Sequence, residues 1–369
     1  MAVLEFKNIT KHFNDITALQ NVSFKTRDGE FLVILGPSGA GKTTTLKITC
    51  GLVNPTEGTV FLDDRDITKV PPYQRNISMT FETYSLYPHM TVFDNMAYPL
   101  RSKKGEFETS EIRQRVEQVA RMLHIDELLN RYPAEASGGQ KQRIALGRTM
   151  VRKPDVYLLD EPLAHLDAKI RVELREEFHR IEELQKTTTI YVTHDYIEAL
   201  SLGDRIMILN EGELLQIGTP EEVFNNPVNL EVARQVGQPA INTFDCTIKK
   251  GEKGFYLQSN NEQSISFQIL PQQQKLLEKY GKERVILGIR PKDIGITEID
   301  KDNRIKAKVE VFQPLGSEGV LTTRAGELPF VGLIDPEAHV KHDELLEIFL
   351  DTNAFYFFDY DLKINLTTH

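Results

Sequence analysis

Gly36-Pro37-Ser38-Gly39-Ala40-Gly41-Lys42-Thr43 fits the pattern Gly-x-x-x-x-Gly-Lys-Ser/Thr, and it is the most informative feature of this chain. The apolar run before it, residues 31–35, predicts a buried strand, and residues 44–50 suit a helix. In that context the glycines let backbone N–H groups converge on phosphates, and the helix N-terminus adds its dipole. Lys42 supplies a cation, and the Thr43 hydroxyl supplies a ligand for Mg²⁺. A glycine turn without function would match this pattern by chance in roughly one chain per hundred of this length. The sequence therefore predicts nucleotide binding.

The composition describes a globular protein with room for two domains. The chain has 369 residues, of which 40% are hydrophobic and 27% are charged. No apolar run approaches the roughly 20 residues that span a bilayer, and the N-terminus lacks the features of a signal peptide. We therefore expect a cytosolic chain.

The net charge limits the kinds of partner that the chain can bind, and the two cysteines indicate the redox state of its thiols. The net charge of −10 argues against nucleic acid and against direct adhesion to anionic lipid. Work at a membrane would thus require another protein to hold the chain there. Cys50 and Cys246 lack metal-ligand spacing and are expected to be buried reduced thiols.

The first part of the chain alternates strands and helices, which is typical of the α/β class. Short strands are predicted at 3–9, 22–26, 31–35 and 59–62, and an amphipathic helix is predicted at about 109–123. Continuous apolar runs at 156–159 and 189–192 favour strands that are buried on both faces of a parallel sheet. A charged helix at 168–185 lies between them.

The character of the sequence changes near Gly237-Gln238-Pro239, so we expect domains at 1–236 and 237–369. The second domain is predicted to be a mostly β, barrel-like fold, with strands at 254–257, 264–269, 285–289, 305–312 and 345–350 and one helix at 272–280. The aromatic run 355–358 is interpreted as a terminal strand that packs into the barrel, with a binding surface as the alternative.

Asp160 and Glu161 directly follow the apolar strand 156–159. Ligands of open α/β sheets bind at the carboxyl ends of the strands, so these carboxylates should face the phosphates. Asp160 is then placed to hold Mg²⁺ through water, and Glu161 is placed to orient the attacking water or to take its proton.

Ser137-Gly138-Gly139-Gln140 precedes a predicted helix at 141–151, with Ser137 as a candidate N-cap. A simple capped helix start is the alternative. The tetrapeptide nevertheless resembles the signature of the ATP-binding cassette superfamily. Residues 81–92 resemble the loop through which cassettes grip membrane subunits. Leu166-Asp167 resembles the family's D-loop, and Val192-Thr193-His194-Asp195 resembles its switch histidine.

The second domain carries a resemblance of its own. Residues 287–291 (Leu-Gly-Ile-Arg-Pro) and 315–318 (Leu-Gly-Ser-Glu) are similar to the regulatory domain of maltose-type importer ATPases. The resemblance implies a P-loop ATPase domain, built of a mixed sheet core, an antiparallel β subdomain and a helical subdomain at about 86–152. An OB-like regulatory barrel would follow it. No Asn-Lys-x-Asp motif that reads guanine occurs, so ATP is preferred over GTP.

The resemblance also implies a two-chain mechanism. Two cassettes would face head to tail, so that Ser137 and Gly139 contact the γ-phosphate held by the opposite chain. His194, at the end of a strand, would hydrogen-bond the γ-phosphate, although a lone histidine is more often a core or surface residue. Phe13 would stack on adenine unless it is a core side chain. The residues implied to bind the nucleotide are Phe13, Gly36, Ser38, Gly39, Gly41, Lys42, Thr43, Thr44, Ser137, Gly139, Gln140 and Asp167, with Thr43, Asp160 and Glu82 at the metal and Glu161, His194 and Glu82 in catalysis.

Two substitutions depart from the family pattern. The gripping loop has Glu82 where glutamine is usual, and an ionised carboxylate can only accept hydrogen bonds. At about 4 Å from a phosphate charge it would meet roughly 4 kcal/mol of repulsion, which metal ligation or protonation would offset. A harmless swap is the alternative. Ala136 stands where the signature usually begins with leucine, which predicts a mild loss of packing. Both changes fit a hypothesis in which this cassette pairs with a different, complementary one.

These observations predict an ATPase subunit of an importer for a carbohydrate, polyol or glycerol-phosphate-like solute. Its expected cofactors are ATP and Mg²⁺. Its expected partners are two transmembrane permease subunits, a second ATPase subunit and an extracytoplasmic solute-binding protein, which place it peripherally at the cytoplasmic face of the membrane. One alternative is a degenerate subunit that senses ATP with little turnover. A soluble cassette acting on DNA or ribosomes is another, and the acidic charge argues against it.

Overall fold

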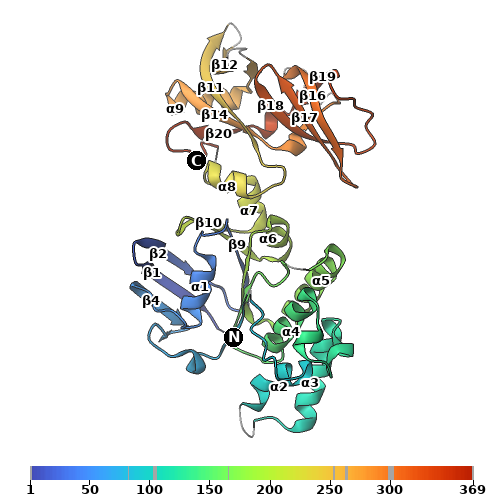
Figure 1. The fold of residues 1–369 in the computed structure, drawn as a ribbon. Helices are drawn as coiled ribbons and strands as arrows, with labels where there is room; N and C mark the ends of the chain where they lie inside the picture. The colour runs from blue at the N-terminus through green and yellow to red at the C-terminus, as the bar shows by residue number, and fades with distance from the viewer. Residues whose placement is uncertain are drawn as a thin grey trace. The chain divides into compact units, whose positions relative to one another are not determined.

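The computed structural model in Figure 1 describes residues 2–81, 83–102, 106–164, 166–251, 254–261, 265–297 and 303–367. Packing divides the chain into two compact units, Met1–Pro220 and Glu221–His369. This division precedes the boundary at 236/237 that the sequence suggests, because the short helices after Pro220 pack with the second unit. The domain limits and the limits of the helical subdomain stay predictions.

The first unit contains ten strands and six helices in its described part, with α7 starting at its last residue. The strands are β1 (Leu4–Phe13), β2 (Ile16–Lys25), β3 (Phe31–Leu35), β4 (Glu57–Leu62), β5 (Arg65–Asp66), β6 (Ile77–Thr80), β7 (Val156–Asp160), β8 (Thr188–Thr193), β9 (Arg205–Asn210) and β10 (Glu213–Gly218). The helices are α1 (Lys42–Thr49), α2 (Val92–Arg101), α3 (Thr109–Met122), α4 (Gly138–Met150), α5 (Ala168–Gln185) and α6 (Tyr196–Leu202), and three 3₁₀ turns are η1 (Pro72–Gln74), η2 (Asp126–Leu128) and η3 (Pro133–Glu135).

A six-stranded mixed sheet forms the centre of the first unit, in the order β10-β9-β3-β8-β7-β6. The five strands from β9 to β6 run parallel, and only β10 pairs antiparallel with its neighbour. Every residue of β3, β7 and β8 is buried, as their continuous apolar runs predict. Leu35 pairs with Thr193, and Asp160 pairs with Val192, so these three strands end at the same edge of the sheet.

The remaining parts of the first unit are an antiparallel sheet and a helical segment. The sheet has the order β2-β1-β4-β5, and its Phe6 and Phe24 rings stack with centroids 4.7 Å apart. The helices α2, α3 and α4 follow β6, and α3 buries Ile112 and Val116 on the predicted stripe. The expected α/β class, with an antiparallel subdomain and a helical subdomain, is confirmed.

The second unit consists mainly of strands. Its elements are α7 (Pro220–Asn225, from its second residue), α8 (Leu230–Gln235), β11 (Asn242–Gly251), β12 (Gly254–Ser259), β13 (Ser266–Gln268), α9 (Pro271–Tyr280), β14 (Arg284–Ile289), η4 (Pro291–Asp293), β15 (Ile294–Gly295), β16 (Arg304–Pro314), β17 (Gly319–Ala325), β18 (Leu328–Ile334), β19 (Leu345–Leu350), η5 (Thr352–Ala354) and β20 (Tyr356–Asp359). They form two antiparallel five-stranded sheets, β13-β12-β11-β14-β20 and β15-β19-β16-β17-β18. This arrangement confirms the barrel-like, OB-like expectation.

The core of the second unit lies between these sheets and is rich in aromatic rings. The Phe244 ring packs 4.8 Å from Phe330 and 5.4 Å from Phe267, measured between centroids. Phe357 and Phe358 are 0% exposed in β20, so the terminal aromatic run is a buried strand as predicted. Its neighbour Tyr356 is half-buried.

Two further expectations concern thiols and membrane spans. Cys50 and Cys246 are both buried and free, which confirms the sequence-based expectation. Across the described ranges no helix combines the length and the apolar character that crossing a membrane requires.

Candidate functional site

The glycine loop joins β3 to α1 at the carboxyl edge of the central sheet. A side chain at Gly36 would bring its Cβ to 2.2 Å from the Leu209 carbonyl oxygen, so only glycine fits there. Gly41 has a φ of 103°, and it is the N-cap of α1 without any side-chain hydrogen bond to the helix. The first-turn N–H groups of α1 are therefore left without a capping side chain, which is the arrangement that receives an anion.

Lys42 is folded over this loop. Its Nζ donates to the carbonyl oxygens of Gly36 at 2.8 Å and Pro37 at 2.9 Å, and the residue is only 7% exposed. These bonds hold the ammonium at the rim of the loop, where the lysine of a phosphate cradle is expected.

Thr43 and Asp160 meet beside the loop. The Thr43 hydroxyl donates to Asp160 Oδ1 at 3.3 Å, which joins the start of α1 to the end of β7. Hydroxyl and carboxylate oxygens are hard ligands of the kind that Mg²⁺ prefers, together with phosphate oxygens and water. No group of three or more His, Cys, Asp or Glu side chains suited to a metal occurs among the described residues. The donor set thus fits a metal that arrives with phosphates.

Glu161 and His194 form the second pair, at the ends of β7 and β8. His194 Nδ1 lies 3.1 Å from Glu161 Oε2. Glu161 has a φ of 45°, a left-handed backbone that costs about 1 kcal/mol for a residue with a side chain. This conformation is held by two bonds: Glu161 N–H donates to the Val192 carbonyl at 3.0 Å, and Gln142 Nε2 donates to the Glu161 carbonyl at 3.0 Å.

A buried carboxylate fixes the end of β8 next to His194. Glu198 is 3% exposed, and its Oε2 accepts from the hydroxyls of Tyr191 and Thr193 at 2.8 Å each. Burial raises the pKa of Glu198, and burial beside this carboxylate raises the pKa of Tyr191 well above its ordinary value. Asp195 caps α6 by accepting from Ile197 N–H at 2.8 Å. The backbone that carries His194 is therefore held on both sides.

The signature tetrapeptide forms the first turn of α4. The Ser137 hydroxyl accepts from Gln140 N–H at 3.3 Å, while Gln140 Oε1 accepts from Ser137 N–H at 2.8 Å, which is a capping box. The helix thus begins at Gly138 and not at Lys141 as predicted, because this reciprocal cap includes the glycines in the first turn. In Figure 1, α1 and α4 lie apart within the first unit. Within one chain, Thr43 and Asp160 meet beside the loop at 36–43, whereas Ser137, Gly139 and Gln140 lie away from it on α4.

The segment 84–91, which belongs to the predicted gripping loop, is held by two side chains from helices. Asn95 in α2 is 0% exposed; its Nδ2 donates to the Tyr87, Met90 and Thr91 carbonyls, and its Oδ1 accepts from Tyr87 N–H. Arg148 in α4 donates to the carbonyls of Tyr84 at 3.2 Å and Ser85 at 2.8 Å, and burial lowers the pKa of Arg148. The Tyr87 side chain is nevertheless exposed.

Other predicted residues lie as follows. Phe13 at the end of β1 is 43% exposed, so it is not a core side chain, and it remains a candidate for stacking on adenine. Asp167 Oδ1 accepts from Ile170 N–H at 3.0 Å in the first turn of α5. Ala136 is buried, 7% exposed. Glu82 lies outside the described residues.

Sequence reasoning missed the side chains that position these groups. Gln142, Asn95 and Arg148 act through backbone carbonyls that are distant in sequence, and a contact of that kind has no spacing pattern. The one available signal was a polar residue on the buried face of an amphipathic helix, as at Asn95.

Comparison with known proteins gives a consistent picture. A family model described as ABC transporter matches residues 19–164. The chain is 41% identical to the trehalose/maltose import ATP-binding protein MalK of Thermococcus litoralis, over 97% of this chain and 98% of that protein. It is 39% identical to the sn-glycerol-3-phosphate import ATP-binding protein UgpC of Yersinia pseudotuberculosis, over 99% of each.

A solved structure extends the comparison to three dimensions. A dimeric post-hydrolysis state of an ATP-binding cassette bound to ADP and Pi is similar to this chain, with a TM-score of 0.55 and 33% identity. The similarity covers 59% of this chain and 98% of that one.

Proposed function

The chain belongs to the ABC transporter family, and we propose that it is the ATP-hydrolysing subunit of an importer. The imported solute would be a carbohydrate, a polyol or a glycerol-phosphate-like compound, as the names of its full-length relatives suggest. The observation that carries the proposal is the convergence of two pairs, Thr43 with Asp160 and Glu161 with His194, at one edge of the central sheet.

ATP binding follows from the loop and its lysine. The N–H groups at the start of α1 and the Lys42 ammonium would hold the phosphates, and Phe13 would stack on the adenine. Thr43 and Asp160 would hold Mg²⁺, which when bound would neutralise part of the phosphate charge. Ser38, Gly39 and Thr44 belong to the same cradle.

Glu161 is the proposed acceptor of the proton from the attacking water, at the end of β7. A carboxylate can only accept, so the contact of His194 Nδ1 with Glu161 requires the Nδ1–H tautomer or a protonated ring. A neutral imidazole with its hydrogen on Nδ1 has no N–H left for a phosphate. In that tautomer His194 would leave Glu161 for a new partner when ATP occupies the site, and this change would release the Glu161 carboxylate toward water.

The working site is proposed to lie between two cassettes. Ser137, Gly139 and Gln140 at the N-terminus of α4 would contact the phosphates held by a second ATPase subunit, and Asp167 would lie at the same interface. That subunit is a second copy of this chain or a complementary cassette. The related solved cassette bound to ADP and Pi is a dimer, which supports pairing.

Two permease subunits would dock on the segment 84–91, with a solute-binding protein on the far side of the membrane. The exposed rings of Tyr87 and Tyr98, with centroids 5.0 Å apart, offer an apolar surface for such contacts. The chain would then be peripheral at the cytoplasmic face of the membrane. Its net charge of −10 does not favour nucleic acid as a partner.

The degenerate, ATP-sensing alternative is not favoured. Lys42, Asp160, Glu161 and His194 are all present, and the chain is similar to import ATPases along its full length.

Hydrolysis of ATP by the purified chain, measured over a range of protein concentrations, tests the proposal. We expect Mg²⁺-dependent specific activity that rises with concentration as chains pair, and we expect Glu161→Gln to abolish turnover while ATP still binds. Full turnover by Glu161→Gln would refute the assignment of the base. Activity only after a different cassette is added would show a heterodimer, and equal activity in both sites of a homodimer would exclude it.

Docking is tested in the assembled transporter. Replacing Tyr87 by alanine should reduce solute uptake while ATP binding persists, because the ring is exposed and lies outside the nucleotide site. The control is Leu362→Ala, which removes an exposed apolar side chain that lies in the second unit and outside the segment 84–91. Equal uptake by both variants would exclude this surface.

A further inference from the structure

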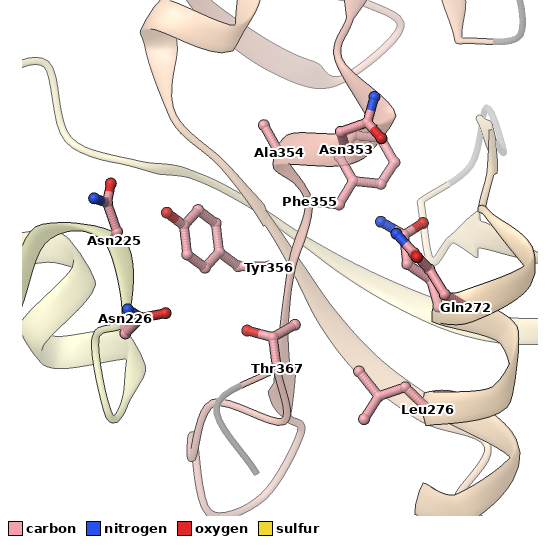
Figure 2. Close-up of a pocket in the computed structure, with 10 residues that line it drawn as sticks. Asn225, Asn226, Gln272, Leu276, Asn353, Ala354, Phe355, Tyr356 and Thr367 are labelled. Carbon is pink, nitrogen blue, oxygen red and sulfur yellow. The ribbon is translucent and has the colours of Figure 1, made fainter. Parts of the chain in front are cut away.

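A pocket of about 370 Å³ lies within the second unit (Figure 2). Its walls come from the end of α7, the first two turns of α9, the stretch from η5 to the start of β20, and Thr367. A volume of this size falls in the range of small-molecule sites. The pocket is distinct from the nucleotide site, since all of its lining residues belong to Glu221–His369.

Side-chain amides dominate the lining. Asn225, Asn226, Gln272, Gln273 and Asn353 contribute, and none of the ten described residues that line the pocket is charged. Each amide offers one acceptor oxygen and two N–H donors. A ligand rich in hydroxyl groups, each both donor and acceptor, is the complement of such a surface.

The amide of Gln273 is held by hydrogen bonds within the protein, whereas the amides of Gln272 and Asn353 are exposed. Gln273 is 7% exposed; its Oε1 accepts from Leu270 N–H at 2.8 Å, and its Nε2 donates to the Thr352 carbonyl at 2.7 Å. These bonds fix the start of α9 against η5. Gln272 is the next residue on that turn and is exposed, as is Asn353 on η5. The fixed wall therefore presents two exposed amides.

Aromatic side chains form the apolar part of the pocket. Phe355 is 4% exposed, and Figure 2 shows the Tyr356 ring directed from β20 toward Asn225 and Asn226. A ring with one apolar face and a polar tip suits the C–H face of a sugar ring and its hydroxyls.

The α7 wall is fixed by a buried cation. Arg290 donates to the carbonyl oxygens of Phe224 and Val236, at 2.5 Å each, and its guanidinium carbon lies 4.0 Å from the Phe224 ring centroid. The same carbon is 5.7 Å from the Tyr356 ring centroid, and Arg290 is 2% exposed. The Arg290 guanidinium therefore binds backbone carbonyls of the wall and is too buried to contact a ligand.

A carboxylate contacts the lining on the η5 side. Asp351 Oδ1 accepts from the Asn353 N–H at 2.9 Å and from Asn353 Nδ2 at 3.0 Å. A phosphorylated ligand would need an accessible cation or a cluster of N–H groups. The described lining supplies amides beside a carboxylate, which disfavours anions.

We propose that this pocket binds a neutral polyhydroxyl solute, a mono- or disaccharide, and not its phosphorylated form. The amides of Gln272, Asn353 and Asn225 bind its hydroxyls, and Tyr356 packs against its ring. In the importer proposed above, such a site reports the level of imported solute to the ATPase. That regulatory link rests on the proposed function, whereas the binding itself does not.

Calorimetric titration of the full-length chain without nucleotide tests the binding. The probes are glucose, maltose and trehalose, with glucose 6-phosphate as the charged counterpart of glucose. We expect at least one neutral sugar to bind with a Kd of about 1 mM or below, and glucose 6-phosphate to bind at least about tenfold more weakly.

Three variants locate the site. Gln272→Ala and Asn353→Ala should each weaken the neutral sugar about tenfold, because a ligand hydroxyl loses its partner. Gln274→Ala is the matched control on α9, since Gln274 does not line the pocket, and its affinity should equal that of the parent chain. An unchanged melting temperature in each variant establishes that the fold is intact.

Each contrary result is decisive. The proposal fails if no neutral probe binds at concentrations up to about 10 mM, if glucose 6-phosphate binds more tightly than glucose, or if both pocket variants bind like Gln274→Ala. An ATPase-inactive chain that still binds sugar would sink the proposed function and leave the pocket assignment standing.

Discussion

Replacing Arg75 by methionine removes the buried cation that closes the C-terminal end of α1, the helix that starts with Lys42 and Thr43. Arg75 is 2% exposed, and it makes four hydrogen bonds to backbone carbonyls. Its Nε donates to a carbonyl before η1 at 2.7 Å, its Nη1 donates to two carbonyls at the end of α1 at 2.9 Å each, and its Nη2 donates to a fourth at 3.1 Å. The acceptors are Val70, Ile48, Thr49 and Thr68.

The loss in the free energy of unfolding can be estimated from these four hydrogen bonds. Burial lowers the pKa of Arg75, so its charge is kept at a desolvation cost of several kcal/mol. Four charge-assisted bonds offset that cost at about 1.5–3 kcal/mol each. In the methionine variant the Ile48 carbonyl keeps the Gly51 N–H at 3.1 Å, while the other three lose this donor. We expect a loss of about 3–5 kcal/mol in the free energy of unfolding of the first unit.

Urea unfolding followed by circular dichroism measures this loss, with ATP added to identify the transition of the nucleotide-binding unit. At a slope of roughly 2–3 kcal/mol per molar urea, the midpoint should fall by about 1–2 M. Arg65→Met, at an exposed position of β5, is the control and should change little. Arg75→Lys should recover part of the loss, because an ammonium has three donors but lacks the planar fork. A loss below about 1 kcal/mol in Arg75→Met would refute the reasoning.

Two further variants test buried carboxylates. Because burial raises the pKa of Glu198, the folded chain binds this proton more tightly than the unfolded chain, so stability falls as the pH rises from the unfolded pKa through the folded one. Glu198→Gln keeps an acceptor oxygen, so its melting temperature relative to the parent should rise between pH 5 and pH 8, and a constant difference would contradict this. The Glu30 side chain is 1% exposed and pairs with Arg205 at 2.5 Å and 3.0 Å. Glu30→Ala should cost about 3–5 kcal/mol in urea unfolding, and the double variant with Arg205→Ala should cost less than the sum of the two single variants, whereas simple additivity would show that the pair does not interact.

The strands that carry the site were predictable because their signal is local. β3, β7 and β8 are buried on both faces, so each appears in the sequence as an unbroken apolar run. β10 and β17 were not predicted, because polar residues interrupt their apolar ones and resemble ordinary loop composition. β18 was missed although its sequence is apolar, because its Pro329 and Gly332 resemble turn residues. β9 was also omitted, although residues 206–209 form an apolar run.

Only part of the candidate site was predictable, because only some of its residues carry a signal that is local in the sequence. Lys42, Thr43, Asp160, Glu161 and His194 stand at fixed positions after predicted strands, so their convergence follows from the topology of a parallel sheet. The residues that hold them in place act on backbone atoms far away in sequence. A guanidinium such as that of Arg75, which reaches four carbonyls, cannot be recognised before those carbonyls have been placed in space.

These positioning contacts give α4 a role that its sequence motif does not describe. Near its C-terminal end, Arg148 binds the carbonyls of Tyr84 and the next residue, within the segment proposed to meet the permeases. At its N-terminal end, a Cβ built on Gly138 would lie 3.7 Å from the Tyr84 hydroxyl. Between these points, Gln142 donates to the carbonyl of Glu161, whose left-handed backbone leaves it little freedom to adjust. α4 therefore contacts both the segment 84–91 and the backbone of Glu161, so a single helix connects the proposed docking segment to the proposed base.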